Sequence, residues 1–126
     1  MAARRAGRGR PARLMAKKAA GVPRPVKTTE HVLRFGTRSA ETGWRDVVAT
    51  QKNAAVDAWD RLTTAPRTSD PRCHQLRGEL ATIVRDGVEH DRWQYELTGG
   101  ARIWYSVEQR TVVVIDVFTA HPNQTK

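Results

Sequence analysis

The segment "HDRWQYELTGGARIWYSV", residues 90–107, carries two arginines, two tryptophans and two tyrosines within 18 residues. A hairpin that is only structural needs one apolar and one polar face, but no arginines among aromatic rings. A guanidinium binds phosphate through two parallel hydrogen bonds, and an indole ring stacks on a base or a sugar. The segment therefore indicates an anion-binding surface, with Arg92, Arg102 and Trp104 as candidate contacts to nucleic acid.

The alternation of side chains along a strand sorts this segment into two faces. A three-residue loop, Thr98-Gly99-Gly100, pairs apolar with apolar residues across the hairpin, whereas a two-residue loop would mix them. This register puts Arg102 opposite Glu96. We expect the polar face to be solvated, and it carries Arg92, Gln94, Glu96, Arg102 and Trp104. A purely structural Glu96–Arg102 pair, which contributes at most about 1 kcal/mol, stays open as an alternative.

The rest of the chain supplies the elements that must position this hairpin. Apolar residues at helical spacing predict a helix pair over about 40–51 and 54–64, with Ser39 and Asn53 as N-caps. The nearly continuous apolar run at 111–120 predicts a central strand that is buried on both faces. The other expected elements are a strand at 31–36, a loop at 67–78 and a strand at 79–84 that turns at Asp86-Gly87. These elements predict an α+β fold in which an N-terminal helical pair packs on a three- to four-stranded antiparallel sheet.

The charge of the chain is concentrated at its N-terminus. Residues 1–30 carry nine basic and one acidic side chain, a net +8, whereas residues 31–126 carry 13 and 12, a net +1. The first segment has almost no large apolar residues, so it cannot offset the entropy cost of ordering. We interpret residues 1–30 as a basic, mostly disordered arm that contacts nucleic acid non-specifically through its charge. A solubilising tail, or a true start at Met15, are the alternatives.

Several function classes are disfavoured by composition. No apolar run approaches the ~20 residues of a membrane span, and the basic N-terminus lacks the apolar core of a secretory signal. The single cysteine, Cys73, fits a reducing compartment. We therefore expect a cytoplasmic protein without a membrane partner. The four histidines have no metal-ligand spacing and there is no glycine-rich phosphate loop, so neither a metal nor another cofactor is expected.

The order of these pieces resembles the RelE/ParE superfamily of bacterial type II toxins. Over residues 31–126, a helix pair is followed by "HQLRG", "RWQYEL", "RIWYSV" and "VVVIDVFTAHP", of which the "RIxY" strand is the most specific piece. The resemblance implies a RelE-like α+β domain whose sheet binds messenger RNA in the ribosomal decoding site. It also implies a toxin of a toxin–antitoxin system that cleaves this RNA without metal, by attack of the 2′-hydroxyl. The implied partners are the ribosome, the message and a cognate antitoxin protein.

The resemblance also assigns roles to individual residues. Arg102 matches the family's catalytic arginine on the "RIxY" strand, which implies that it binds the scissile phosphate. His121 lies at the end of the last strand, where relatives carry a catalytic side chain, and is expected to be the general acid or base. Glu96 is a further candidate base. The expected contacts to RNA are Arg77, Arg92, Gln94 and Trp104.

Two departures from the family pattern keep other functions open. Where some relatives carry two basic residues on the strand of "RWQYEL", this chain has Gln94 and Glu96, and no tyrosine follows His121. The reduced set of basic residues leaves two alternatives. One is a ParE-like inhibitor of DNA gyrase, and the other is a non-catalytic module of the same fold that binds RNA or protein.

Overall fold

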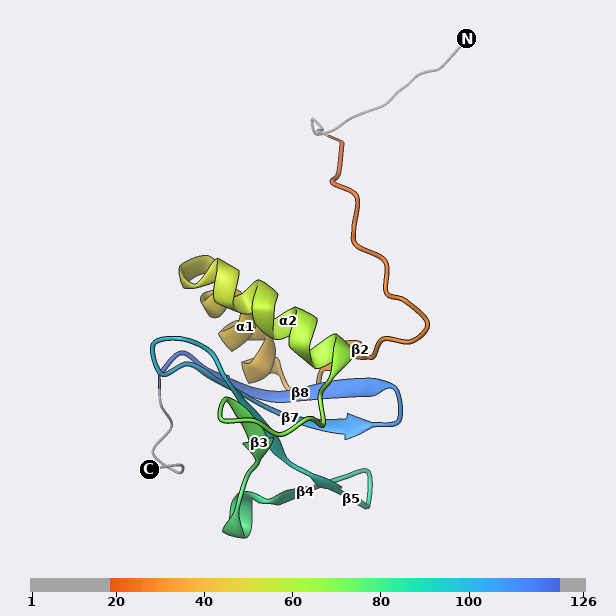
Figure 1. The fold of residues 1–126 in the computed structure, drawn as a ribbon, viewed down its shortest axis with the longest axis vertical. Helices are drawn as coiled ribbons and strands as arrows, with labels where there is room; N and C mark the ends of the chain where they lie inside the picture. The colour runs from red at the N-terminus through yellow and green to blue at the C-terminus, as the bar shows by residue number, and fades with distance from the viewer. Residues whose placement is uncertain (1–18, 121–126) are drawn as a thin grey trace.

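The computed structural model describes residues 19–120 and has an α+β fold, as the sequence predicts. The elements follow one another as β2 (Val32–Phe35), α1 (Arg38–Thr50), α2 (Lys52–Thr64), β3 (Cys73–Gln75), the short 3-10 helix η2 (Gly78–Leu80), β4 (Thr82–Arg85), β5 (Val88–Asp91), β6 (Trp93–Glu96), β7 (Arg102–Glu108) and β8 (Thr111–Phe118). The two helices cover one face of the main sheet, and the β4–β5 hairpin lies on the opposite side (Figure 1).

The main sheet has five strands in the order β2-β8-β7-β6-β3, and β2 runs parallel to β8 while the other pairs are antiparallel. The prediction of a three- to four-stranded antiparallel sheet is therefore wrong in both strand number and direction. Parallel neighbours need a long connection, and here the helix pair and the following strands separate β2 from β8. The last strand, β8, was expected to be central and buried on both faces. It is an interior strand between β2 and β7, and most of its residues are buried.

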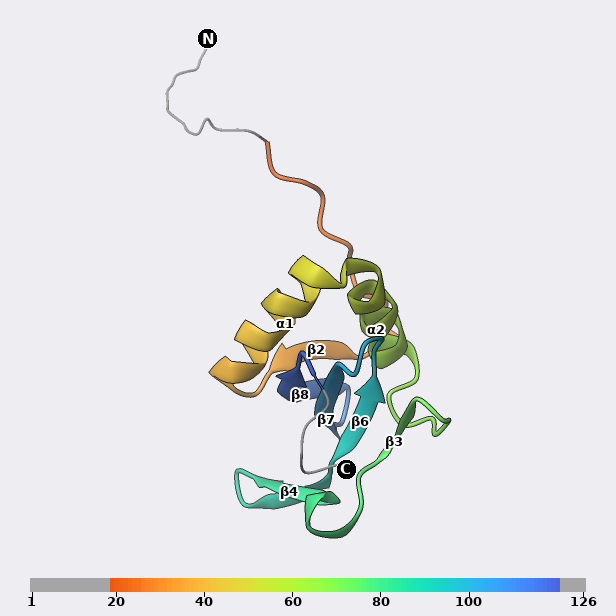
Figure 2. The same ribbon diagram turned by 90° about the vertical axis from the view of Figure 1, so that its left-hand side faces the viewer.

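The segment expected to supply one strand at 79–84 behaves differently. It begins as η2, and the following strand β4 pairs only with β5 in a separate two-stranded sheet (Figure 2). The turn between them is the predicted Asp86-Gly87, where both residues have positive φ, as tight two-residue hairpins require. The place beside β6 is taken by β3, which lies in the segment 67–78 that was expected to be loop.

The helix pair is present, but its caps are not the predicted ones. The Thr37 hydroxyl accepts a hydrogen bond from the Ala40 amide at 3.0 Å and donates one to the Ile115 carbonyl at 2.7 Å. Thr37 is therefore the N-cap of α1 in place of Ser39. The hydrogen bond to Ile115 also attaches the start of the helix to β8. The residue before α2 is Gln51, which makes no side-chain capping bond, so Asn53 is not a cap either.

The core lies between the helices and the sheet. Its fully buried members come from both layers and include Ala40, Val47, Ala58, Leu62, Ile103, Tyr105 and Val112. Among them, Tyr105 on β7 carries a polar group whose hydrogen bonds are all internal. Its hydroxyl donates to the Pro66 carbonyl at 2.6 Å and lies 3.0 Å from the Cys73 sulfur. Burial raises the pKa of Tyr105 and that of the Cys73 thiol, so both stay neutral at physiological pH.

Tyr105→Phe is expected to destabilise the protein by about 1–2 kcal/mol, because it leaves the buried Pro66 carbonyl without its donor. The matched control is Tyr95→Phe on the adjacent strand β6, since the Tyr95 hydroxyl has no hydrogen bond within residues 19–120. Urea unfolding monitored by circular dichroism measures both variants. Equal midpoints for the two would mean that the Pro66 contact contributes nothing.

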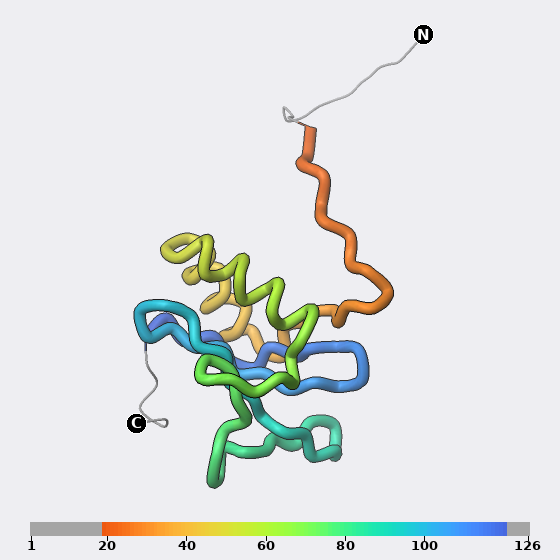
Figure 3. The backbone as a smooth tube through the Cα atoms, viewed as in Figure 1, coloured from red at the N-terminus to blue at the C-terminus, as the bar shows by residue number. Residues whose placement is uncertain are grey.

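Part of the expected arm is attached to the body. The segment from Arg24 to Glu30 approaches the helix layer next to β2 (Figure 3). The Arg24 guanidinium lies 4.9 Å from the centre of the Trp59 ring and forms an ion pair of 3.0 Å with the buried Glu30. Hydrogen bonds from Arg24 and from the Lys27 amide hold the pKa of Glu30 below its usual range. The Arg110 guanidinium donates to the Thr28 carbonyl at 2.6 Å.

A chain that lacks residues 1–28 is therefore expected to fold, because its core is complete without them, but to have a lower Tm than the full chain. The truncation leaves the Glu30 carboxylate without Arg24 and Lys27. Arg24→Ala in the full chain should lower Tm in the same direction. An unchanged Tm in the truncated protein would show that these contacts do not stabilise the body.

Candidate functional site

The β6–β7 hairpin has the predicted register. Glu96 is the cross-strand partner of Arg102, and the Leu97 amide donates to the Ala101 carbonyl at 2.9 Å. The loop between them is Thr98-Gly99-Gly100, in which both glycines have positive φ. Trp93 and Tyr95 belong to the core on the helix side of the sheet, together with their cross-strand partners Tyr105 and Ile103. The alternating residues lie on the opposite face, as predicted: Gln94, Glu96, Arg102 and Trp104.

That face is not solvated, which corrects the expectation from the sequence. Only 8% of Arg102 and 3% of Trp104 is exposed, Gln94 is also buried, and Arg92 and Glu96 are half-buried. The reason is that these large side chains pack against one another instead of extending into solvent. The site is therefore a compact polar cluster on the sheet face away from the helices.

Trp104 is the centre of this cluster. Its indole nitrogen donates to the Gln94 side-chain oxygen at 2.8 Å, and the Phe118 ring meets it edge-on with centroids 4.8 Å apart. The Arg92 guanidinium lies 5.6 Å from the Trp104 ring centre. Because the Trp104 ring is packed in this way, it is not accessible for stacking on a base. Its contacts instead position the Gln94 side chain and the Arg92 guanidinium.

Two arginines of the cluster keep unused hydrogen-bond donors. Arg102 donates from Nη1 to the Ala101 carbonyl at 3.2 Å, and the same nitrogen lies 3.6 Å from the Glu96 carboxylate. The Nε atoms of Arg102 and Arg92 are buried and have no hydrogen-bond partner within residues 19–120. Buried polar groups are normally paired, so two unsatisfied guanidinium donors on one face are a feature that an anion would satisfy.

The strand register adds two titratable residues that the sequence interpretation missed. His74 on β3 is the partner of Gln94, Gln94 is the partner of Trp104, and Trp104 is the partner of Asp116 on β8. These four residues form one row across four strands, next to the row that contains Glu96 and Arg102. The sequence signals for them were the "HQLRG" histidine and the single acidic residue inside the apolar run at 111–120, but only the register brings them together.

Asp116 and His74 differ in their surroundings. Desolvation raises the pKa of Asp116, and the nearby Arg92 guanidinium opposes part of this rise. His74 is half-buried, and its Nδ1 lies 3.1 Å from the Gln75 carbonyl, which leaves Nε2 without a partner within residues 19–120. A carboxyl group whose pKa is raised and an imidazole with a free nitrogen are both suited to moving protons.

Arg77, another predicted site residue, does not join this cluster, because it is exposed and lies just before η2. His121 lies outside the residues that the structure describes. Within residues 19–120, no three histidine, cysteine, aspartate or glutamate side chains come close enough to hold a metal ion.

The other half of the same sheet face has a structural role. The β4–β5 hairpin covers it, and the Glu108 carboxylate accepts hydrogen bonds from Arg85 at 2.6 Å and from Ser106 at 3.3 Å. His90 lies 3.8 Å from the same carboxylate. These contacts hold the small hairpin against β7.

No protein-family model, curated protein or solved structure matches this chain. Within residues 19–120, no helix has the length and apolar character needed to cross a membrane. A functional proposal therefore depends on the geometry of the cluster and on the resemblance of the motifs.

Proposed function

We propose that this chain is a RelE-like toxin of a type II toxin–antitoxin system and that it cleaves messenger RNA on the ribosome without metal. The observation that carries the proposal is a pair of arginines, Arg92 and Arg102, whose Nε atoms are buried and unsatisfied on one sheet face within residues 19–120. Carboxyl and imidazole groups lie on the same face, in Glu96, Asp116 and His74. A phosphate-binding group beside proton-moving groups is what RNA cleavage requires.

In the proposed reaction, a base removes the proton of the 2′-hydroxyl, and the resulting oxygen attacks the adjacent phosphorus. The bond from phosphorus to the 5′-oxygen breaks, and an acid protonates this leaving oxygen. The products are a 2′,3′-cyclic phosphate and a 5′-hydroxyl. Arg102 binds the scissile phosphate, whose negative charge increases in the transition state. Glu96 or Asp116 is suited to the role of base, and His74 or His121 to that of acid.

The burial of the cluster supports a second candidate function. Because Arg102 and Trp104 are almost fully buried, a form that only binds a partner, as in ParE-like gyrase inhibitors, needs no access to these groups. The nuclease, by contrast, needs the face around Arg102 to open when RNA binds. The two candidate functions therefore differ in whether Arg102 must become accessible to RNA.

Mapping of messenger RNA ends after induction of the chain in a bacterial host separates these functions. The nuclease predicts growth arrest with discrete breaks inside translated messages, and co-expression of a cognate antitoxin should relieve both. Breaks should be absent from untranslated RNA, since cleavage depends on the ribosome. Growth arrest with relaxed plasmid DNA and intact messages would favour gyrase inhibition. Normal growth would reject every toxin function.

His74→Ala is expected to reduce cleavage by about 100-fold if His74 is the acid. The matched control is His90→Ala on β5, whose imidazole contacts Glu108 in the structural half of the sheet face. Rates of cleavage by purified protein on programmed ribosomes measure both variants. An unchanged rate in a folded His74→Ala protein would assign the acid to another residue.

A further inference from the structure

The edge strand β2 has one side that is not paired within residues 19–120. The amides of Val32 and Gly36 donate to the carbonyls of Arg110 and Val114, so residues 32, 34 and 36 direct their backbone groups toward β8. In a parallel pair the residues between them point the opposite way. The amides and carbonyls of Leu33 and Phe35 therefore face outward, and they have no backbone partner among the described residues.

The open stretch is short and has defined ends. At the preceding outward position, the His31 amide donates to the Thr63 carbonyl at the end of α2, at a distance of 2.8 Å. Beyond Phe35, Thr37 caps α1 and turns the chain away. The edge thus offers two outward residues, Leu33 and Phe35, which can form up to four hydrogen bonds with an added strand.

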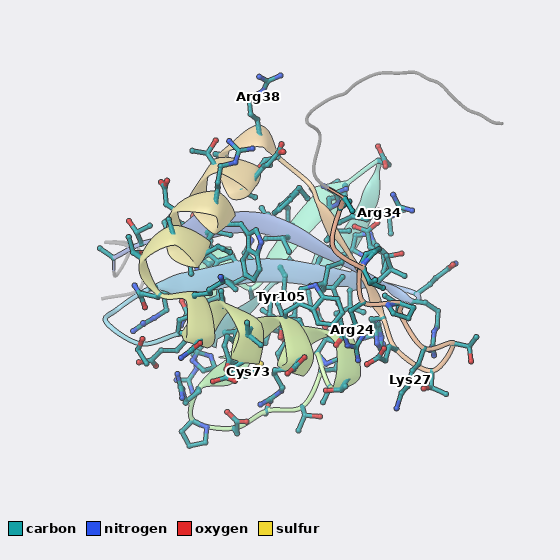
Figure 4. All side chains as sticks on the ribbon, turned by 90° about the horizontal axis from the view of Figure 1, so that it is seen from above. Arg24, Lys27, Arg34, Arg38, Cys73 and Tyr105 are labelled. Carbon is teal, nitrogen blue, oxygen red and sulfur yellow. The ribbon has the colours of Figure 1, made fainter. Side chains whose placement is uncertain are left out.

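The side chains along this edge are apolar and basic. Val32 is 39% exposed and Phe35 is 45% exposed, while Leu33 packs partly against the core. Figure 4 shows Lys27 near the start of β2, Arg34 beside the strand and Arg38 beyond its end. None of these three cations forms a salt bridge within residues 19–120, whereas Arg24, on the same side of the molecule, is paired with Glu30.

We propose that the outer edge of β2 binds an extended acidic segment of a partner protein as an added strand. Alternate carboxylates of that segment face Arg34, near Lys27 and Arg38, and its apolar residues pack beside Leu33 and Phe35. A second copy of this chain is a poor occupant, because antiparallel pairing of two β2 strands would bring the two Arg34 side chains together. Nucleic acid would use the cations but not the outward amides or the exposed Phe35.

This inference does not depend on the proposed nuclease. The sheet order places β2 at one edge and β3, with His74, at the other, so an occupant of β2 does not touch the Arg102 cluster directly. Failure of one proposal leaves the other intact, since binding is measured without RNA or ribosomes.

The test uses the full chain and a blocked heptapeptide of alternating valine and glutamate, labelled for fluorescence anisotropy. We expect saturable binding, together with slower hydrogen exchange at the outward amides of Leu33 and Phe35. A heptapeptide of valine and lysine should not bind. A valine–glutamate peptide that is N-methylated at every valine should not bind either, because antiparallel pairing that places the valines beside Leu33 and Phe35 directs the valine amides toward β2. No saturable binding of the parent peptide up to about 1 mM would overturn the proposal.

Variants of the protein test the same contacts from the other side. Arg34→Glu should weaken binding by at least about tenfold, while Arg45→Glu, an exposed arginine on α1, should leave it unchanged. Phe35→Pro removes one outward amide, and an edge strand tolerates proline at such an unpaired position. Phe35→Ala is the control for the lost aromatic ring. If Phe35→Pro does not fold, the N-methylated peptide carries this part of the test.

Two outcomes would replace the proposal by another one. Equal binding of the N-methylated and parent peptides would show that charge alone attracts them. Binding of a uridine oligonucleotide that is lost in Arg34→Glu, with no binding of the peptide, would identify a nucleic-acid surface instead of an added strand.

Discussion

Replacing Arg102 by alanine is expected to reduce ribosome-dependent cleavage of messenger RNA by roughly 100- to 1,000-fold. Arg102 is the only residue of the "RIxY" strand that both matches the catalytic arginine of the resembling family and keeps a buried, unsatisfied Nε within the described part of the chain. If that donor binds the scissile phosphate, truncation removes charge and orientation together. Arg102→Lys should restore only part of the rate, because lysine lacks the planar fork of donors.

The burial of Arg102 makes a folding control necessary. Its side chain is 9% exposed, so removal leaves a gap beside Trp104 and an unpaired Glu96. Thermal unfolding of each variant must therefore accompany the cleavage assay. In the unfolding measurement, Glu96→Gln is the matched control for the ion pair, since it removes the same pair but keeps the guanidinium. It is not a control for cleavage, because Glu96 is itself a proposed base. A folded Arg102→Ala protein that cleaves like the wild type would remove the proposed site and the main reason to prefer a nuclease.

The fold was predictable where a local pattern specifies it. Helical periodicity predicted both helices, and face matching across Thr98-Gly99-Gly100 predicted the register of β6 and β7. The parallel pairing of β2 with β8 was not predictable, because it joins segments almost eighty residues apart and no periodicity encodes it. The short strand β3 was missed because three residues within a loop carry no pattern of their own.

The sequence predicted which residues of the β6–β7 hairpin belong to the site. It did not predict how these residues pack or which residues of other strands join them. Alternation assigned Arg92, Gln94 and Trp104 to one face, but it gave no information on how they pack. Burial of that face follows from the contacts of Trp104 with Gln94 and Phe118, and the second contact requires the position of β8. His74 and Asp116 were missed for the same reason, since each joins the cluster only through pairing between strands.

Gly43→Ala is expected to destabilise the protein by about 2–3 kcal/mol, although alanine is normally the better helix former by about 1 kcal/mol. Gly43 is a buried residue of α1 that lies against Val117 of β8. A Cβ atom added there would overlap the Val117 carbonyl oxygen and lie 2.9 Å from the Val117 Cβ. Backbone atoms cannot move aside by a change of rotamer, so α1 would have to move away from the sheet and loosen the core around Ala40 and Val47.

The sign of this effect separates packing from helix propensity. The matched control is Thr42→Ala, an exposed position in the same turn of α1, where the change should stabilise the protein by a few tenths of a kcal/mol. For a domain of this size, Gly43→Ala should lower Tm by about 10–20 °C. Thermal and urea unfolding of both variants provide the measurement. A higher Tm in Gly43→Ala would mean that α1 does not approach β8 as closely as the overlap with Val117 requires, and the contact of the Thr37 hydroxyl with Ile115 would then be in question as well.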